Sequence, residues 1–181
     1  HHYDVMKAVP CVRACPRLEV VQAWQSQLIA VVGASDPRLV CIYDTSEYTV
    51  WNPAAELSAF GEEVVAAVFS KDDVSLYIIA ANNAIFQVDV QSGAVVQSIA
   101  WQQGLMSTMD ITADGVWVLT AADDDSVHAL CTKSLERQRF IGHAGKVTAV
   151  ACHRTLPFAV SIGASGQVHV WQITDSDIRG P

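Results

Sequence analysis

Short runs of alternating apolar residues, separated by polar turns, make up most of this chain. The clearest runs are VTAVACH (147–153), FAVSIGA (158–164) and VHVWQI (168–173), which are joined by the turns RTLP and SGQ. Runs of this kind, rich in Val, Ile, Ala, Phe and Trp, are typical of short β-strands. No long segment keeps its apolar residues at helical spacing, so the pattern predicts an all-β fold.

The same succession of strands recurs along the chain. Aligned on the C-terminal runs, the ends of the first strands fall at Ser26, Ser70, Thr112 and His153, which are 44, 42 and 41 residues apart. A period of about 40 to 45 residues that holds four strands is typical of a propeller blade. The period predicts four consecutive four-stranded antiparallel blades, at about 20–57, 58–100, 101–141 and 142–173.

Gly142-His143 opens the last copy of the repeated unit, and VFSKDD and DITADG cover the first strand and turn of two earlier copies. These motifs resemble the opening Gly-His and the first strand and turn of the WD repeat, and the resemblance extends from about position 20 to 173. The place of its Trp-Asp pair is taken by Tyr43-Asp44, Val88-Asp89, Leu130-Cys131 and Trp171-Gln172. The resemblance implies a β-propeller of WD-repeat type, in which this chain is part of a ring of about seven blades or is completed by a partner.

The resemblance also implies a buried hydrogen-bond network within each blade, formed in WD repeats by a His, a Ser or Thr, an Asp and the Trp. The last blade keeps His143, Ser161 and Trp171, with Ser165 in the place of the Asp. The third blade keeps Asp124 but lacks the His and the Trp. We therefore expect His143, Ser161, Trp171 and Asp124 to have a structural role.

The two ends of the repeat raise the question of how the last blade is completed. After residue 173 the chain continues as TDSDIRGP, in which no strand is evident, so we expect this blade to lack its outer strand. Residues 3–10 resemble a lone strand that completes either the last blade or an upstream one. An open last blade would expose an apolar face, which missing blades or a partner would cover.

Composition narrows the classes of partner and the compartment. The net charge of −8 and the pI near 5.0 argue against direct binding of nucleic acid. No apolar run approaches the ~20 residues that cross a bilayer, so we expect no membrane insertion. Five cysteines, three of them within apolar runs, favour a reducing intracellular compartment, the cytoplasm or alternatively the nucleus.

Candidate partner-binding residues fall in turns that a blade places on one face. These turns lead into first strands or join second to third strands, and they carry Glu62, Glu63, Trp101, Asp123 and Asp125. Such an acidic face suits a basic peptide, although solvated turns are often acidic without binding anything. Trp101 is expected to be exposed, with packing against a neighbouring blade as the alternative. Trp24, Trp51 and Trp117 are expected in the core.

Motifs of catalysis and metal binding are missing from the sequence. It contains no Gly-x-Ser-x-Gly, no phosphate-binding Gly-rich loop and no His-Glu-x-x-His. Cys11 and Cys15 lack a second pair of ligands for a metal. We therefore expect no enzymatic activity, cofactor or metal. The sequence predicts a protein–protein interaction scaffold whose loops assemble an intracellular complex. The alternative is a C-terminal regulatory propeller domain of a larger trafficking protein or enzyme.

Overall fold

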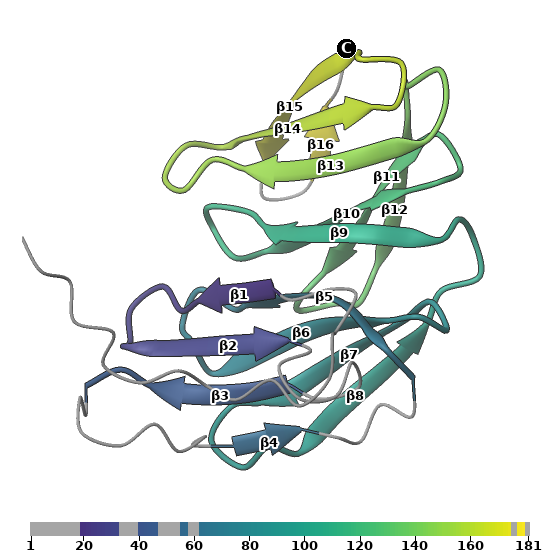
Figure 1. Ribbon diagram of the computed structural model, residues 1–181. Helices are drawn as coiled ribbons and strands as arrows, with labels where there is room; N and C mark the ends of the chain where they lie inside the picture. Colours follow the sequence, from purple (N-terminus) through teal and green to yellow (C-terminus); the bar gives the residue numbers. More distant parts are fainter. Residues whose placement is uncertain (1–18, 33–39, 47–54, 58–61, 175–176, 180–181) are drawn as a thin grey trace, which may run out of the picture. The chain divides into compact units, whose positions relative to one another are not determined.

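The computed structural model describes residues 19–32, 40–46, 55–57, 62–174 and 177–179. Within these ranges the chain forms sixteen β-strands and no helix (Figure 1), and so no helix that could cross a membrane. The predictions for residues 3–10, for Cys11 and Cys15, and for Trp51 lie outside the described residues.

The strands form four antiparallel sheets, each made of four strands that are consecutive in the chain (Figure 1). The first sheet contains β1 (Glu19–Gln22), β2 (Leu28–Val32), β3 (Val40–Asp44) and β4 (Ala55–Leu57). The second contains β5 (Val64–Phe69), β6 (Ser75–Ala80), β7 (Ala84–Asp89) and β8 (Val95–Ala100). The third contains β9 (Met106–Ile111), β10 (Trp117–Ala122), β11 (Ser126–Cys131) and β12 (Arg137–Ile141). The fourth contains β13 (Val147–Cys152), β14 (Phe158–Gly163), β15 (Val168–Thr174) and β16 (Asp177–Arg179). This order confirms the predicted all-β fold of consecutive four-stranded antiparallel units, the arrangement of WD-type propeller blades.

One backbone hydrogen bond recurs in all four sheets, where the first strand turns into the second. The N–H groups of Ala23, Ser70, Thr112 and His153 donate to the carbonyls of Leu28, Ser75, Trp117 and Phe158. The equivalent positions are therefore 47, 42 and 41 residues apart. The alignment on Ser26 is corrected, because β1 ends at Gln22 and Ser26 belongs to the turn that follows.

The fourth strand of the last sheet corrects a second prediction. β16 pairs with the end of β15, with Ile178 opposite Ile173 and Asp177 opposite Thr174. Ile178 is only 4% exposed and joins the core of this part of the chain. The strand gave no signal in the sequence because it has three residues and a single apolar side chain, so that pairing with β15 rather than alternation defines it.

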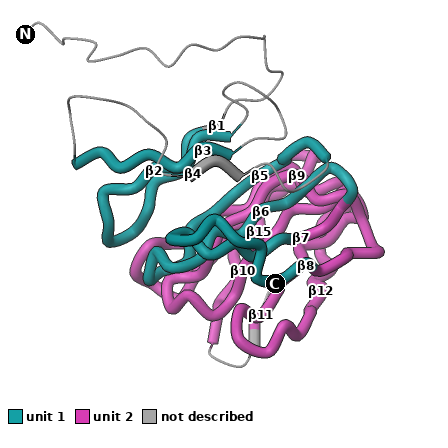
Figure 2. Tube along the Cα trace, turned by 90° about the horizontal axis from the view of Figure 1, so that it is seen from below, with its two compact units in different colours: residues 1–82, 86–98 teal, residues 83–85, 99–181 magenta. Residues whose placement is uncertain are grey.

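The chain divides into two compact units (Figure 2). The first comprises residues 1–82 and 86–98, and the second comprises residues 83–85 and 99–181. In the first unit the first strands β1 and β5 of the two sheets are neighbours, and in the second unit β9 and β13 are neighbours. Each unit therefore holds a pair of adjacent sheets that meet along their first strands.

The two pairs of sheets pack in the same way. In the first unit, the β2 face with Ala30 and Val32 forms one core with Leu76 and Ile78 of the second sheet. In the second unit, the equivalent β10 face with Trp117, Leu119 and Ala121 forms one core with the fourth sheet. The fourth sheet contributes Ala159, Trp171, Ile173 and Ile178 to it. One face of each leading sheet is thus buried by the sheet that follows it.

In the first unit, Asp73 joins the two sheets by polar contacts. Its carboxylate accepts hydrogen bonds from the backbone N–H groups of Trp24, Gln25 and Ser26 at 2.7, 2.7 and 2.6 Å. Asp73 has φ 58°, a left-handed conformation that Gly115 adopts in the corresponding turn of the third sheet. Its side chain therefore does what a glycine there cannot, because it fixes the first turn of the preceding sheet.

Candidate functional site

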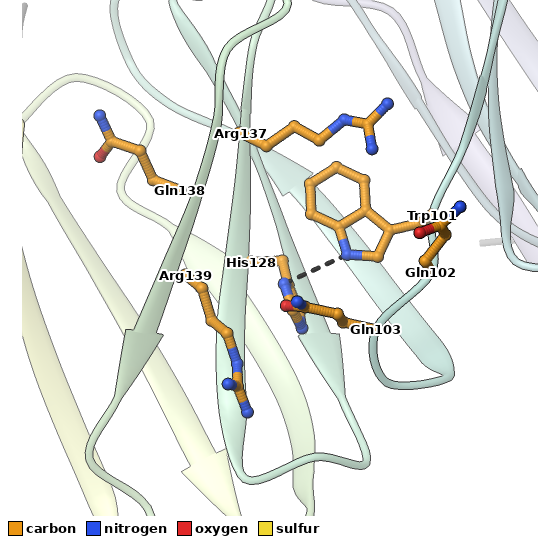
Figure 3. Close-up of a pocket in the computed structure, with 7 residues that line it drawn as sticks. All are labelled: Trp101, Gln102, Gln103, His128, Arg137, Gln138 and Arg139. Carbon is orange, nitrogen blue, oxygen red and sulfur yellow. Dashed lines mark hydrogen bonds between the residues drawn. The ribbon is translucent and has the colours of Figure 1, made fainter.

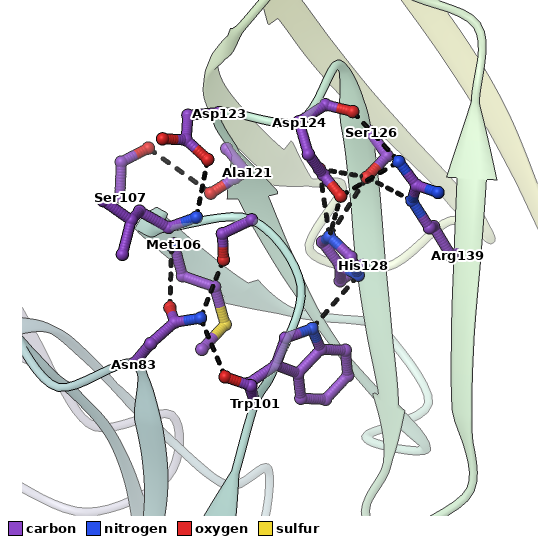
Figure 4. Close-up of polar contacts among 12 residues, drawn as sticks. Asn83, Trp101, Met106, Ser107, Ala121, Asp123, Asp124, Ser126, His128 and Arg139 are labelled. Carbon is purple, nitrogen blue, oxygen red and sulfur yellow. Dashed lines mark hydrogen bonds and ion pairs between the residues drawn. The ribbon is translucent and has the colours of Figure 1, made fainter.

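The third sheet contains a chain of hydrogen-bonded side chains that begins at Trp101 and ends at Arg139 (Figure 4). The indole Nε1–H of Trp101, in the loop before β9, donates to Nδ1 of His128 on β11 at 3.2 Å. Nε2 of His128 lies 3.1 and 3.2 Å from the carboxylate oxygens of Asp124 and 3.0 Å from Oγ of Ser126. Ser126 donates its hydroxyl to Asp124, and Arg139 on β12 forms an ion pair with the same carboxylate at 3.0 Å. This set of side chains is called the Trp101 network below.

The indole of Trp101 determines where the proton of His128 sits. An indole nitrogen only donates, so Nδ1 must accept and the proton of the neutral ring lies on Nε2, facing Asp124. Burial lowers the pKa of His128, although Asp124 acts in the opposite direction. Burial would raise the pKa of Asp124, but the Ser126 hydroxyl, His128 and Arg139 together lower it. The network therefore pairs a neutral imidazole with an ionised carboxylate.

The third sheet has Gln102 and Leu130 at the positions of His143 and Trp171, each 41 residues earlier, so the His and the Trp of the repeat do not stand there. A different indole and imidazole meet in this sheet, those of Trp101 and His128. The fourth sheet has its imidazole, His143, in the loop before the first strand and its indole, Trp171, on the third strand. In the third sheet the indole of Trp101 is in that loop and the imidazole of His128 is on the third strand. Either order brings an indole N–H to a buried acceptor.

In the fourth sheet the structure brings the predicted residues His143, Ser161 and Trp171 together. Trp171 donates its indole N–H to Oγ of Ser161 at 2.8 Å, and Nε2 of His143 lies 2.6 Å from the same oxygen. All three side chains are buried, and the ring of His169 stacks on His143 with centroids 4.0 Å apart. This contact set satisfies the indole with a hydroxyl in place of an imidazole.

The fourth sheet also shows what the loss of the carboxylate does. Ser165, which stands in the place of the Asp, is exposed, and no described group hydrogen-bonds to the buried Nδ1 of His143. Burial, with the neighbouring His169, lowers the pKa of His143. Protonation of this ring therefore has no carboxylate to favour it.

The loop that carries Trp101 is held at several points by backbone and side-chain contacts (Figure 4). Asn83 donates from Nδ2 to the carbonyls of Trp101 and Gly104 at 3.1 and 2.7 Å, and its Oδ1 accepts from the N–H of Met106 at 3.0 Å. Asp123 accepts from the N–H of Leu105 at 2.6 Å. Gly104 has φ 58°, and a Cβ there would lie 2.6 Å from Cγ of Asp124, so the loop requires glycine.

A pocket of about 280 Å³ lies beside the Trp101 network (Figure 3). Its walls come from the loop before β9 and from β11 and β12, and consist of Trp101, Gln102, Gln103, His128, Arg137, Gln138 and Arg139. Arg137 and Arg139 are two residues apart on β12 and extend from the same side of the strand. The guanidinium of Arg137 lies over the ring of Trp101, with Cζ 5.2 Å from its centroid.

The outer face of the fourth sheet is apolar and uncovered within its unit. On β14, Phe158, Val160 and Ile162 are 39, 37 and 42% exposed, and on β15, Val168 and Val170 are 59 and 57% exposed. Val160 lies opposite Val170 and Ile162 opposite Val168, so the five side chains share one face. These five residues are called the β14–β15 face below.

The predicted partner-binding residues lie at different depths. Glu62, Glu63, Asp123 and Asp125 are exposed, as expected for turn residues. The expectation of an exposed Trp101 is wrong, because its side chain is only 8% exposed and its indole N–H is occupied by His128. Of the tryptophans expected in the core, Trp117 is 2% exposed and Trp24 packs half-buried against the first core.

In both units, hydrogen bonds join the loop that leads into a first strand to the turn between the second and third strands of the same sheet. In the third sheet Leu105 donates to Asp123, and in the fourth sheet the N–H of Ala144 donates to Oε1 of Gln167. In the second sheet the N–H of Ala81 donates to the carbonyl of Glu63.

Within the described ranges, no group of three or more His, Cys, Asp or Glu side chains is placed to hold a metal ion.

Comparison with known proteins finds a distant relative that contains WD repeats. No protein-family model matches the chain. The chain is similar to the uncharacterized WD repeat-containing protein sll1491 of Synechocystis sp., with 26% identity over 117 residues. The matched region is 64% of this chain and 34% of that protein, so the chain spans about a third of the length of its relative. The likeness agrees with a WD-like repeat.

Sequence reasoning missed His128, Arg137 and Arg139 as members of a polar site. His128 lies within an apolar strand, and Trp101 precedes it by 27 residues, so no local motif joins them. Two signals were present, the Asp124-x-x-x-His128 spacing across a tight turn and the alternation of arginines in RQR (137–139). An alternating pair of charges on an outer strand indicates that both side chains lie on one face.

Proposed function

We propose that the chain is a non-enzymatic protein-interaction scaffold, whose sheets and loops bind other proteins in an intracellular complex. Its likeness to a WD repeat-containing protein supports a repeat domain of this class. The observation that carries the proposal is the exposure of the β14–β15 face.

The β14–β15 face is the repeat of a face that is buried elsewhere in the structure. Its members Phe158, Val160 and Ile162 each follow by 41 residues a member of the β10 face, namely Trp117, Leu119 and Ala121. The three earlier residues are 2, 0 and 0% exposed because the fourth sheet covers them. Equivalent positions on β2, in the first unit, are covered in the same way by the second sheet.

The occupant of the β14–β15 face is a β-sheet of the same repeat type, contributed by a partner. In both units the covering surface is a sheet face made of apolar side chains, such as Ala159, Trp171 and Ile173 of the fourth sheet. Burial of apolar surface contributes about 25 cal/mol per Å², so five large side chains give a partner sheet a substantial driving force. Contiguous exposed apolar surface of this kind is typical of interaction sites.

The acidic turns form a second part of the proposal, in which basic peptide segments bind the exposed turns of each unit, Glu62 and Glu63 in the first and Asp125 in the second. Asp123 is less suited to this role because its carboxylate already accepts from Leu105. Asp125→Lys is expected to weaken binding of a basic peptide, and unchanged binding would remove this part. The alternative, a C-terminal regulatory domain of a larger trafficking protein or enzyme, stays a prediction.

The test of the apolar face is affinity purification of the tagged chain with quantitative mass spectrometry. Val160→Lys combined with Val170→Lys changes a cross-strand pair in the middle of the face, and Val96→Lys changes a Val of similar exposure, 62%, on β8. All three positions are open to solvent, so both variants are expected to fold. The double variant should lose the proteins that the wild type and Val96→Lys retain. Equal recovery with all three chains would contradict the proposal.

A further inference from the structure

The pocket beside the Trp101 network has a charge opposite to that of the chain as a whole. The chain carries a net charge of −8, whereas the pocket is lined by two arginines, three glutamines, Trp101 and His128, with no carboxylate among the lining residues. Figure 3 shows Arg137 and Arg139 reaching from β12 toward the two rings. A site of this composition attracts anions.

The two arginines of the pocket differ in what they bind. Arg139 pairs with the Asp124 carboxylate, and it also donates to Oγ of Ser126 at 3.2 Å and to the carbonyl of Asp124 at 3.1 Å. The guanidinium of Arg137 contacts the ring of Trp101 and forms no hydrogen bond or ion pair with any residue in the described ranges. Arg137 therefore supplies one uncompensated positive charge and a free face of N–H donors.

The indole ring of Trp101, which lies under Arg137, is held in place by hydrogen bonds. The indole of Trp101 is fixed by His128, and its backbone N–H and carbonyl are both hydrogen-bonded to Asn83, at 3.0 and 3.1 Å. A guanidinium held over a fixed ring loses less conformational freedom when it binds a ligand. Gln102 and Gln103 are exposed at the rim and add amide donors.

We propose that this pocket binds a side-chain or terminal carboxylate of an acidic protein segment, with Arg137 as the bidentate partner of the carboxylate. The inference rests on the proposed function in one respect, that the chain binds other proteins, but it uses a surface separate from the β14–β15 face. One guanidinium without a counter-charge matches the single negative charge of a carboxylate. A phosphate dianion would require a second cation, and Arg139 is already paired with Asp124.

The test is fluorescence polarisation with a labelled, terminally blocked peptide of alternating Asp and Glu residues at physiological salt. A peptide with Asn and Gln in the same positions is the neutral control, and a phosphoserine peptide and inorganic phosphate are the competing anions. Arg137→Gln should weaken binding of the acidic peptide at least about tenfold, a loss typical of one charge-assisted hydrogen-bonded pair. Lys133→Gln removes the same charge from the exposed turn before β12 and should change binding less than about twofold.

Several results would overturn the proposal. Binding of the neutral peptide as tight as that of the acidic one, equal losses for Arg137→Gln and Lys133→Gln, or a preference for the phosphoserine peptide would each do so, as would no binding to the wild type. Near-ultraviolet circular dichroism checks that Arg137→Gln is folded. If it is not, Arg137→Lys keeps the charge and should still lose severalfold in affinity, because a lysine lacks the bidentate fork; full affinity would contradict the assignment.

The result of this experiment is independent of the result of the test of the proposed function. Val160→Lys with Val170→Lys should leave binding of the acidic peptide unchanged. Loss of the peptide site with intact partner recovery would remove only the inference about the pocket, and the reverse result would remove only the proposal about the β14–β15 face.

Discussion

At the residue scale, a buried indole N–H needs an acceptor, and the third and fourth sheets meet this need with different groups. Trp101 donates to an imidazole nitrogen that is oriented by Asp124, whereas Trp171 donates to the hydroxyl of Ser161. Both tryptophans are less than a tenth exposed. Both sites thus satisfy an indole N–H, and they differ in the group that accepts its hydrogen bond.

Trp101→Phe tests the indole contact of the third sheet. The substitution leaves Nδ1 of His128 buried without a donor, so we expect the free energy of unfolding to fall by about 2 kcal/mol. Trp24→Phe is the control, since that half-buried indole donates to a backbone carbonyl over a longer distance, 3.3 Å, and should cost less. Urea unfolding of the three proteins measures the difference, and equal losses would contradict a special role for the Trp101 network.

The two buried histidines predict a pH dependence of stability. Both folded-state pKa values, of His128 and His143, are lowered below 6.5, His128 chiefly by burial and His143 by burial and then His169. The unfolded chain therefore takes up these protons first as the pH falls, so the stability they contribute is full above pH 6.5 and is lost as the pH falls through the folded pKa values. Ionisation of Asp124 changes only at lower pH, because its pKa is lowered from 3.8.

Urea unfolding between pH 7.5 and pH 5 checks this dependence. We expect the wild type to lose stability over this interval, and His128→Gln to show a flatter profile, because glutamine does not titrate. Gln91→Ala is the control, because it changes an exposed turn residue that does not ionise and should leave the profile as it is. Stability that rises toward pH 5 in the wild type would contradict the sign.

At the scale of the element, the turn between β5 and β6 has two roles, since it closes its own hairpin and contacts the preceding sheet. Ser70 and Asp72 hold the turn through a hydrogen bond of 2.6 Å, and Thr112 and Asp114 do the same between β9 and β10 at 2.5 Å. Asp73 then reaches the preceding sheet. The turn of the second sheet thus combines local closure with contact between sheets.

Asp73→Asn tests the contact between these two sheets. An amide has one acceptor oxygen where the carboxylate has two, so at least one of the three N–H groups of residues 24–26 loses its partner. We expect about 1–2 kcal/mol of destabilisation and faster hydrogen exchange at these three amides. Asp44→Asn, at an exposed strand end, is the control and should leave hydrogen exchange at residues 24–26 unchanged. Unchanged exchange at these residues in Asp73→Asn would contradict the role of the contact.

The strands and their order could be predicted from the sequence, and part of the polar chemistry could not. Alternation and turn residues placed the first three strands of the last sheet to within a residue, because half-buried strands impose a period of two. The contact between Trp101 and His128 in the third sheet could not be predicted, since it depends on which side chains meet across a blade. β16 was missed for the same reason, because pairing defines it.

At the scale of the whole molecule, the account rests on one repeated relationship between sheets. A leading sheet presents an apolar face to the sheet that follows, and this holds in both compact units. The fourth sheet presents the same face, and no sheet of its own unit covers it. Binding at this face uses the contact that already stabilises each pair of sheets, so the interaction surface and the fold have a common physical basis.

Hydroxyl-radical footprinting of the chain, alone and in the complexes recovered with it, measures this surface directly. We predict that Phe158, Ile162 and Val170 are modified in the free chain and protected in the complex, while the exposed Val96 on β8 reacts equally in both. Unchanged modification of the β14–β15 face in the complex, or protection only at the acidic turns, would contradict the central claim.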